Sequence, residues 1–207
     1  MLWSNAEMQN RFDKYKILSV TLAFLIPQLA FAHEAVGMRF GSFMGGLAHP
    51  VLGADHFLAM VSVGILSAQI GGRAIWTVPA TFVGVMAFGG LLGMIDVGLS
   101  AIETGIACSL LALGFAIAMD RKMPLSAAMT VVGFFAIFHG YAHGAEMPNV
   151  AKPVIYSIGF LTGTALLHLF GVIIGDIAKR YAQGKMLLRI AGGAIAGIGT
   201  AFLVGLA

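Results

Sequence analysis

Two apolar stretches of this sequence contain histidines and carboxylates, the side chains that most often bind transition metals or transfer protons. The first covers residues 47–64, LAHPVLGADHFLAMVSVG, and contains His49, Asp55 and His56. A charged group at membrane depth costs about 2.5 kcal/mol or more, so its default role is functional. His49 and His56 are seven residues apart and share one face if the stretch is helical. Gly53, between them, would let a ligand approach the backbone closely.

The second stretch is FHGYAHGAEMP, residues 138–148. His139 and His143 are four residues apart and Glu146 follows three later, so a helix places all three in one stripe. HxxxH on a helix is a chelating spacing, and a carboxylate one turn further on strengthens it. A single intramembrane histidine more often has a hydrogen-bonded packing role. The two stretches taken together favour a metal or proton site.

The elements that must position these residues are membrane helices. Of the 207 residues, 59% are hydrophobic and 10% are charged, whereas soluble domains carry about 25% charge. The mean hydropathy is +0.93 and the sequence pI is about 9.2. The basic residues stand in short clusters between apolar runs, which indicates membrane topology rather than nucleic-acid binding. The lone Cys108 excludes a disulfide framework and a cysteine-rich metal site.

The N-terminus has the features of a bacterial secretory signal peptide over residues 1–32. A basic region at 11–16 and a short apolar region at 17–27 precede an A-x-A cleavage site at 30–32. An uncleaved first transmembrane helix is the alternative. Cleavage would leave a mature chain over 33–207, a single transmembrane domain that begins at His33. The α-amine and imidazole of His33 would then be available to a metal, or the residue is merely tolerated after the cleavage point.

We expect an all-α membrane protein in which six transmembrane helices follow the signal peptide. Glycine and alanine in these spans suit close helix packing in lipid. Pro50 and the glycines beside the polar groups are typical of a discontinuous transporter helix. The two polar spans, first and fourth, occupy equivalent places in a 3+3 inverted repeat, although the halves share little else. The apolar windows of about 20 residues fall at about 44–68, 74–95, 98–119, 125–146, 153–177 and 187–206.

The loops predict an inner-membrane protein whose mature N-terminus is periplasmic. In this orientation the outer loops hold only Arg39 and Lys152, as the positive-inside rule requires. The loops that face the cytoplasm hold Arg73, Arg121, Lys122, Lys179, Arg180, Lys185 and Arg189.

In the same orientation the polar groups converge on the outer half of the bilayer. His49 and Glu146 would lie near the outer boundary, as would Glu103 at the outer end of the third span. His168, one turn after Thr164 on the fifth span, would lie deeper. It is either a second station on a path or a hydrogen-bonded histidine.

Mixed imidazole and carboxylate ligands without thiolate favour a borderline divalent metal such as Ni²⁺, Co²⁺, Zn²⁺ or Cu²⁺. The twelve methionines form no cluster near the histidines, so they do not indicate Cu⁺. The partners expected are therefore a divalent metal ion and the lipid bilayer, with no resident cofactor.

The motifs HPVLGADH, followed by FLAMVSVG, and FHGYAHGAEMP resemble those of the HupE/UreJ family of nickel/cobalt permeases. The resemblance extends from His33 to the C-terminus and includes the Glu103 segment. It implies secondary uptake of Ni²⁺ or Co²⁺ across the bacterial inner membrane, to supply an enzyme such as hydrogenase or urease. The positions that match the two family motifs are His49, Asp55 and His56 in the first, and His139, His143 and Glu146 in the second.

An intramembrane zinc hydrolase of the ceramidase type is the alternative from another class, since HxxxH with a separate Asp and His could activate a water on Zn²⁺. Such an enzyme would need a serine close to the metal histidines. In the sequence Ser62 and Ser67 are inward of His56, and we expect no serine near His139. Transport without enzymatic activity is therefore the favoured prediction.

Overall fold

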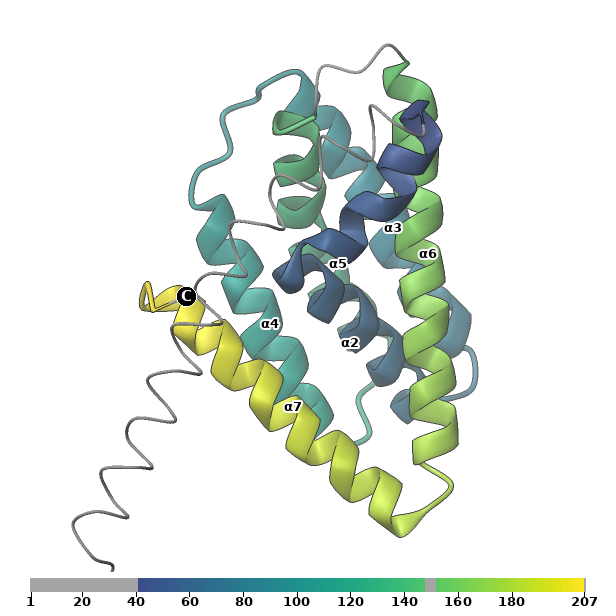
Figure 1. The fold of residues 1–207 in the computed structure, drawn as a ribbon. Helices are drawn as coiled ribbons and strands as arrows, with labels where there is room; N and C mark the ends of the chain where they lie inside the picture. The colour runs from purple at the N-terminus through teal and green to yellow at the C-terminus, as the bar shows by residue number, and fades with distance from the viewer. Residues whose placement is uncertain (1–40, 148–151, 207) are drawn as a thin grey trace, which may run out of the picture.

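The chain forms a bundle of helices, which the computed structural model describes over residues 41–147 and 152–206 (Figure 1). The expected signal peptide and His33 lie outside the described residues. Within these ranges there is no β-strand. A first helix, Gly41–Leu52, precedes α2 (Ala54–Ile70), α3 (Ala74–Met94), α4 (Ile102–Met119), α5 (Leu125–Ala145), α6 (Pro153–Ala178) and α7 (Ala182–Leu203).

The helices follow the predicted apolar windows. The five from α3 to α7 are each long and apolar enough to cross a membrane. The window expected at 44–68 is two helices, Gly41–Leu52 and α2, bent by 82° at the break between them. Counting this bent pair as one span yields up to six spans, and the expected discontinuity of the first span is confirmed.

The helices pack in three close pairs, α2 with α6, α3 with α5, and α4 with α7, and glycines permit this close packing. A Cβ atom on Gly64 would overlap the carbonyl oxygen of His168, and one on Gly140 would overlap that of Met86. A Cβ atom on Gly114 would meet the backbone of Ala196 in the same way. The prediction that the glycines serve close packing is confirmed, because only a residue without a side chain permits this approach.

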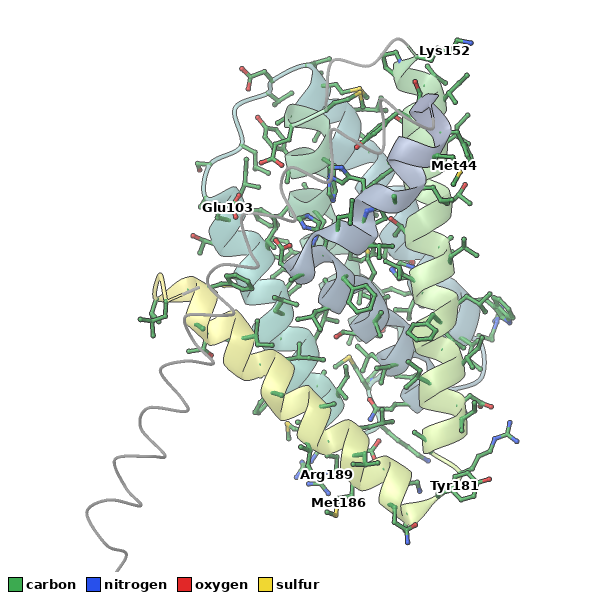
Figure 2. The ribbon with its side chains drawn as sticks, in the orientation of Figure 1. Met44, Glu103, Lys152, Tyr181, Met186 and Arg189 are labelled. Atoms are coloured by element: carbon green, nitrogen blue, oxygen red, sulfur yellow. The ribbon has the colours of Figure 1, made fainter. Side chains whose placement is uncertain are left out.

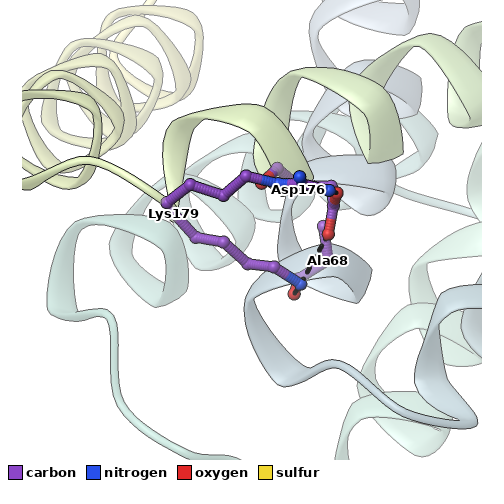
Figure 3. Close-up of polar contacts among 4 residues, drawn as sticks. Ala68, Asp176 and Lys179 are labelled. Carbon is purple, nitrogen blue, oxygen red and sulfur yellow. Dashed lines mark hydrogen bonds and ion pairs between the residues drawn. The ribbon is translucent and has the colours of Figure 1, made fainter.

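The ends of α2, α4 and α6 lie with the start of α7 at one end of the bundle. We call this end, which includes Lys179, Arg180, Lys185 and Arg189, the basic end. Figure 2 shows Tyr181, Met186 and Arg189 there, with Lys152 at the opposite end. The ammonium of Lys179 donates to the carbonyl oxygen of Ala68 (3.2 Å) and pairs with Asp176 (2.8 Å), as Figure 3 shows. This contact provides a donor for a carbonyl in the last turn of α2 and ties that turn to the end of α6.

Candidate metal centre

Most of the predicted site residues surround one cavity of about 360 Å³. They come from Gly41–Leu52, α2, α4 and α5, and lie toward the end opposite the basic end, where Figure 2 labels Glu103. The convergence of three spans expected from the sequence is therefore found. The cavity is lined by His49, Gly53, Asp55, His56, Glu103, Ile106, Ala142, His143 and Glu146.

The first span is broken, and both of its histidines contact a third histidine, His143. His49 belongs to Gly41–Leu52, whereas His56 lies in the first turn of α2, beyond the bend. They therefore do not share the face of one continuous helix, and the expectation drawn from their spacing is wrong in that respect. Both still contact His143, with ring centroids 4.9 Å and 4.1 Å away. At the bend, a Cβ atom on Gly53 would lie 3.3 Å from His56 Nδ1, so a side chain there would crowd the imidazole.

The carboxylate of Asp55 orients His56. Nδ1 of His56 lies 2.9 Å from Oδ1 of Asp55. An ionised carboxylate can only accept, so Nδ1–H donates and the lone pair of the neutral ring lies on Nε2. Nε2 of His56 is buried and has no hydrogen-bond partner among the described residues. A carboxylate that fixes the tautomer of an imidazole in this way is the usual outer-shell arrangement of a metal-binding histidine.

A serine orients His139, which is fully buried next to the cavity lining, with its ring 4.9 Å from that of His56. The hydroxyl of Ser109 donates to the carbonyl oxygen of Ile106 (2.6 Å), and its Oγ lies 2.8 Å from Nε2 of His139. Because the single hydroxyl proton is used, Nε2–H donates and Nδ1 keeps the lone pair. That Nδ1 has no hydrogen-bond partner within residues 41–147 and 152–206. The expectation that no serine lies near His139 was wrong, because Ser109 approaches from a different helix.

Two aromatic residues of α6 complete the surroundings and were missed in the sequence. The hydroxyl of Tyr156 lies 2.7 Å from Nδ1 of His49. Phe160 packs its ring 4.2 Å from that of His143 and 5.9 Å from that of His49. The only available signal was the position of Tyr156, three residues after Pro153 and therefore near the same membrane boundary as Glu146.

The side chains surround the cavity without converging on one point. No three His, Cys, Asp or Glu side chains of the described part of the chain are arranged to hold a single metal ion. The histidine rings pack against one another, and both Glu103 and Glu146 are exposed at the cavity. The ligand set expected from the sequence therefore remains a prediction, and a shared ion would require rotation of these side chains.

His168 lies apart from this cavity, deeper along α6. It is 1% exposed, and neither ring nitrogen has a hydrogen-bond partner in the described ranges. Its ring packs edge-on against Phe82 at 5.1 Å, and Phe82 also contacts His139 at 5.6 Å. Of the two roles expected for His168, that of a hydrogen-bonded histidine is not what the structure shows.

Comparison with known proteins finds similar sequences over most of the chain. The family model described as HupE / UreJ protein matches residues 21–202. Protein HupE of Rhizobium leguminosarum bv. viciae is 44% identical over 194 residues, which are 93% of this chain and 100% of that protein. No solved structure matches.

Proposed function

Because the chain belongs to the HupE/UreJ family, we propose that it is a secondary transporter that takes up Ni²⁺ or Co²⁺ across the bacterial inner membrane. Membership of this family supports nickel or cobalt uptake in general, and a permease rather than an enzyme. The observation that carries the proposal is the cavity of about 360 Å³ that collects histidines and carboxylates from four helices.

The cation would bind first to the lone pairs that the chain leaves available. His56 Nε2 and His139 Nδ1 are oriented by Asp55 and Ser109, so their lone pairs are aligned before the ion arrives. His49 and His143 complete an imidazole set that suits Ni²⁺ and Co²⁺. The exposed carboxylates of Glu103 and Glu146 at the cavity would attract the hydrated cation.

We propose that the basic end faces the cytoplasm and the cavity faces the periplasm. The clustering of arginine and lysine at one end supports this orientation through the positive-inside rule. A cleaved signal peptide over 1–32 would make 33–207 the mature permease domain. His33, as the terminal residue on the periplasmic side, would then be a further ligand.

We propose that the bundle is a 3+3 inverted repeat, which would open alternately to the two sides. Exchanging the halves replaces α2 by α5, α3 by α6 and α4 by α7. The close pair α2–α6 then becomes α5–α3, which is also a close pair, and α4–α7 becomes itself. The 82° bend beside His56 is where the first span would change shape.

A functional link to hydrogenase or urease maturation is part of the proposal, since the imported metal would supply such an enzyme. The zinc hydrolase alternative is not favoured, even though Ser109 lies against His139. The hydroxyl proton of Ser109 is committed to the carbonyl of Ile106, so the serine acts on the histidine as an acceptor. Family membership also supports a transporter.

The test is the initial rate of uptake of radioactive Ni²⁺ by cells that express the wild type, His56→Ala or Thr162→Val at equal membrane levels. Thr162 is the matched control because its hydroxyl bonds to the carbonyl of Ile158 on the exposed side of α6. We expect wild-type and Thr162→Val uptake to be equal and suppressed by Co²⁺, and His56→Ala uptake to fall to background. Wild-type uptake no higher than that of cells without the protein, or full uptake by His56→Ala, would contradict the proposal.

A further inference from the structure

Two buried polar side chains on α6 have no hydrogen-bond partner in the part of the chain that the structure describes. They are Thr164, which is 0% exposed, and His168, which is 1% exposed. The two are four residues apart, so they lie on the same face of the helix. A buried polar group without a hydrogen-bond partner destabilises the folded protein. Such a pair is therefore not explained by packing alone.

Thr162 shows that an ordinary solution exists on the same helix. Its hydroxyl donates to the carbonyl of Ile158, four residues earlier (2.7 Å), which is the common arrangement of threonine in a membrane helix. The hydroxyl of Thr164 makes no such bond. Its oxygen, like the nitrogens of His168, remains available to a ligand.

His168 is connected to the cavity through aromatic rings. The rings of His56, His139, Phe82 and His168 contact one another in this order, with successive centroid distances of 4.9, 5.6 and 5.1 Å. Phe82 is fully buried and is the ring that both inner imidazoles contact. In this series of contacts from the cavity to His168, the ring of Phe82 is thus the one apolar ring, and it lies between His139 and His168.

His168 also borders a cavity at the outer surface of the α3–α6 pair, where Trp76 and Leu169 are exposed. This second cavity, between α3 and α6, has a volume of about 290 Å³. The same cavity is lined by Ile75 and Trp76 in the first turn of α3, which begins at the basic end beside Arg73. His168 stands ten residues before the end of α6 at Ala178, roughly 15 Å along the helix axis. It is therefore buried, has no hydrogen-bond partner among the described residues, and lies nearer the basic end than the residues of the first cavity do.

We propose that His168 and Thr164 form a second, inner station for the transported divalent cation, an inference that rests on the proposed uptake function. One imidazole nitrogen and one hydroxyl would bind the ion, and water would supply its other ligands. A site with so few protein ligands binds weakly. Weak binding is what the last station of a path needs, because an ion must leave as readily as it enters. Phe82 would have to turn aside for the ion to pass from His139.

The first experiment separates the two stations by comparing transport with binding. Uptake of radioactive Ni²⁺ by cells is measured for the wild type, His168→Leu, Thr164→Val and the matched control Thr162→Val. Binding of Ni²⁺ to the purified full-length proteins is measured by equilibrium dialysis. We expect His168→Leu to lower uptake at least tenfold and Thr164→Val to lower it about threefold. High-affinity binding at the outer cavity should change less than twofold in both, and Thr162→Val should match the wild type.

Thermal unfolding of the same variants tests whether His168 is only structural. Leucine removes two unpartnered buried nitrogens, so His168→Leu should unfold at a temperature equal to or higher than that of the wild type. Normal uptake by His168→Leu overturns the proposal, as does an equal loss of binding and uptake, which would assign His168 to the outer cavity. A wild type that takes up no Ni²⁺ would instead contradict the proposed function itself.

If His168→Leu fails to reach the membrane, His168→Gln replaces it in the uptake and dialysis measurements. Glutamine keeps a polar side chain but lacks the imidazole nitrogens, so uptake should again fall at least tenfold while Ni²⁺ binding at the outer cavity changes less than twofold. Normal uptake by His168→Gln would overturn the inner station.

Discussion

The outer cavity and the His168 region both contain buried imidazoles, but they differ in how the rings are held. Asp55 orients His56, and Ser109 orients His139. His168 and the neighbouring Thr164 have no such partners in the described residues. Orientation of a ligand by a second group strengthens metal binding, whereas its absence leaves a weak site. If the proposed path is correct, the same side chain serves capture of the ion at one depth and its release at another, depending on its hydrogen-bond partners.

The largest effect among variants that keep every imidazole is expected from Asp55→Asn. The amide cannot replace the carboxylate as a charged acceptor for Nδ1–H of His56, so Ni²⁺ affinity at the outer cavity should fall about 10–100-fold. Equilibrium dialysis of the purified protein measures this change. Asp120→Asn is the matched control, because Asp120 is exposed beyond α4 at the basic end. Equal affinity in Asp55→Asn and the wild type would remove the distinction between oriented and unoriented histidines.

A smaller effect is expected from Ser109→Ala. The substitution removes the acceptor of the Nε2–H of His139 and leaves a buried donor unpaired, which should lower the free energy of unfolding by about 1–3 kcal/mol. With its tautomer no longer fixed, His139 should bind Ni²⁺ about tenfold more weakly. Ser67→Ala is the control, since Ser67 is also buried but bonds to the carbonyl of Val63. Denaturation and dialysis measure the two effects, and a variant with wild-type affinity would show that Ser109 does not orient a ligand.

The smallest effect is expected outside both regions, from Lys179→Met at the basic end. Its side chain is 35% exposed in the pair with Asp176, and such pairs contribute about 0–1 kcal/mol. Methionine keeps the length of the side chain while removing the bond to Ala68. Uptake of Ni²⁺ should therefore change less than about twofold. A tenfold loss would indicate that the contact between the ends of α2 and α6, outside both histidine regions, controls transport.

Features that depend on composition and local order were predictable from the sequence. The apolar windows located the helices from α3 to α7, and Pro50 with the neighbouring glycines indicated the interruption of the first span. The two polar stretches identified the residues that line the cavity. Partners that approach from other helices, such as Ser109 and Tyr156, were not predictable. Neither has a local pattern that distinguishes it from other hydroxyl-bearing residues in a span.

By itself the sequence determined that this is a multi-span helical membrane protein with histidines and carboxylates in two of its apolar stretches, because bilayer length and the cost of charge at membrane depth act on the chain locally. Only the tertiary structure decided which imidazole nitrogens carry the available lone pairs. That choice depends on an acceptor that the chain brings from a distance, as Ser109 does for His139, or places beyond a bend, as with Asp55 and His56. It also decided that His168 has no such acceptor among the described residues. A hydrogen bond depends on the positions of two atoms in space, and the glycine-mediated packing of the helices sets these positions.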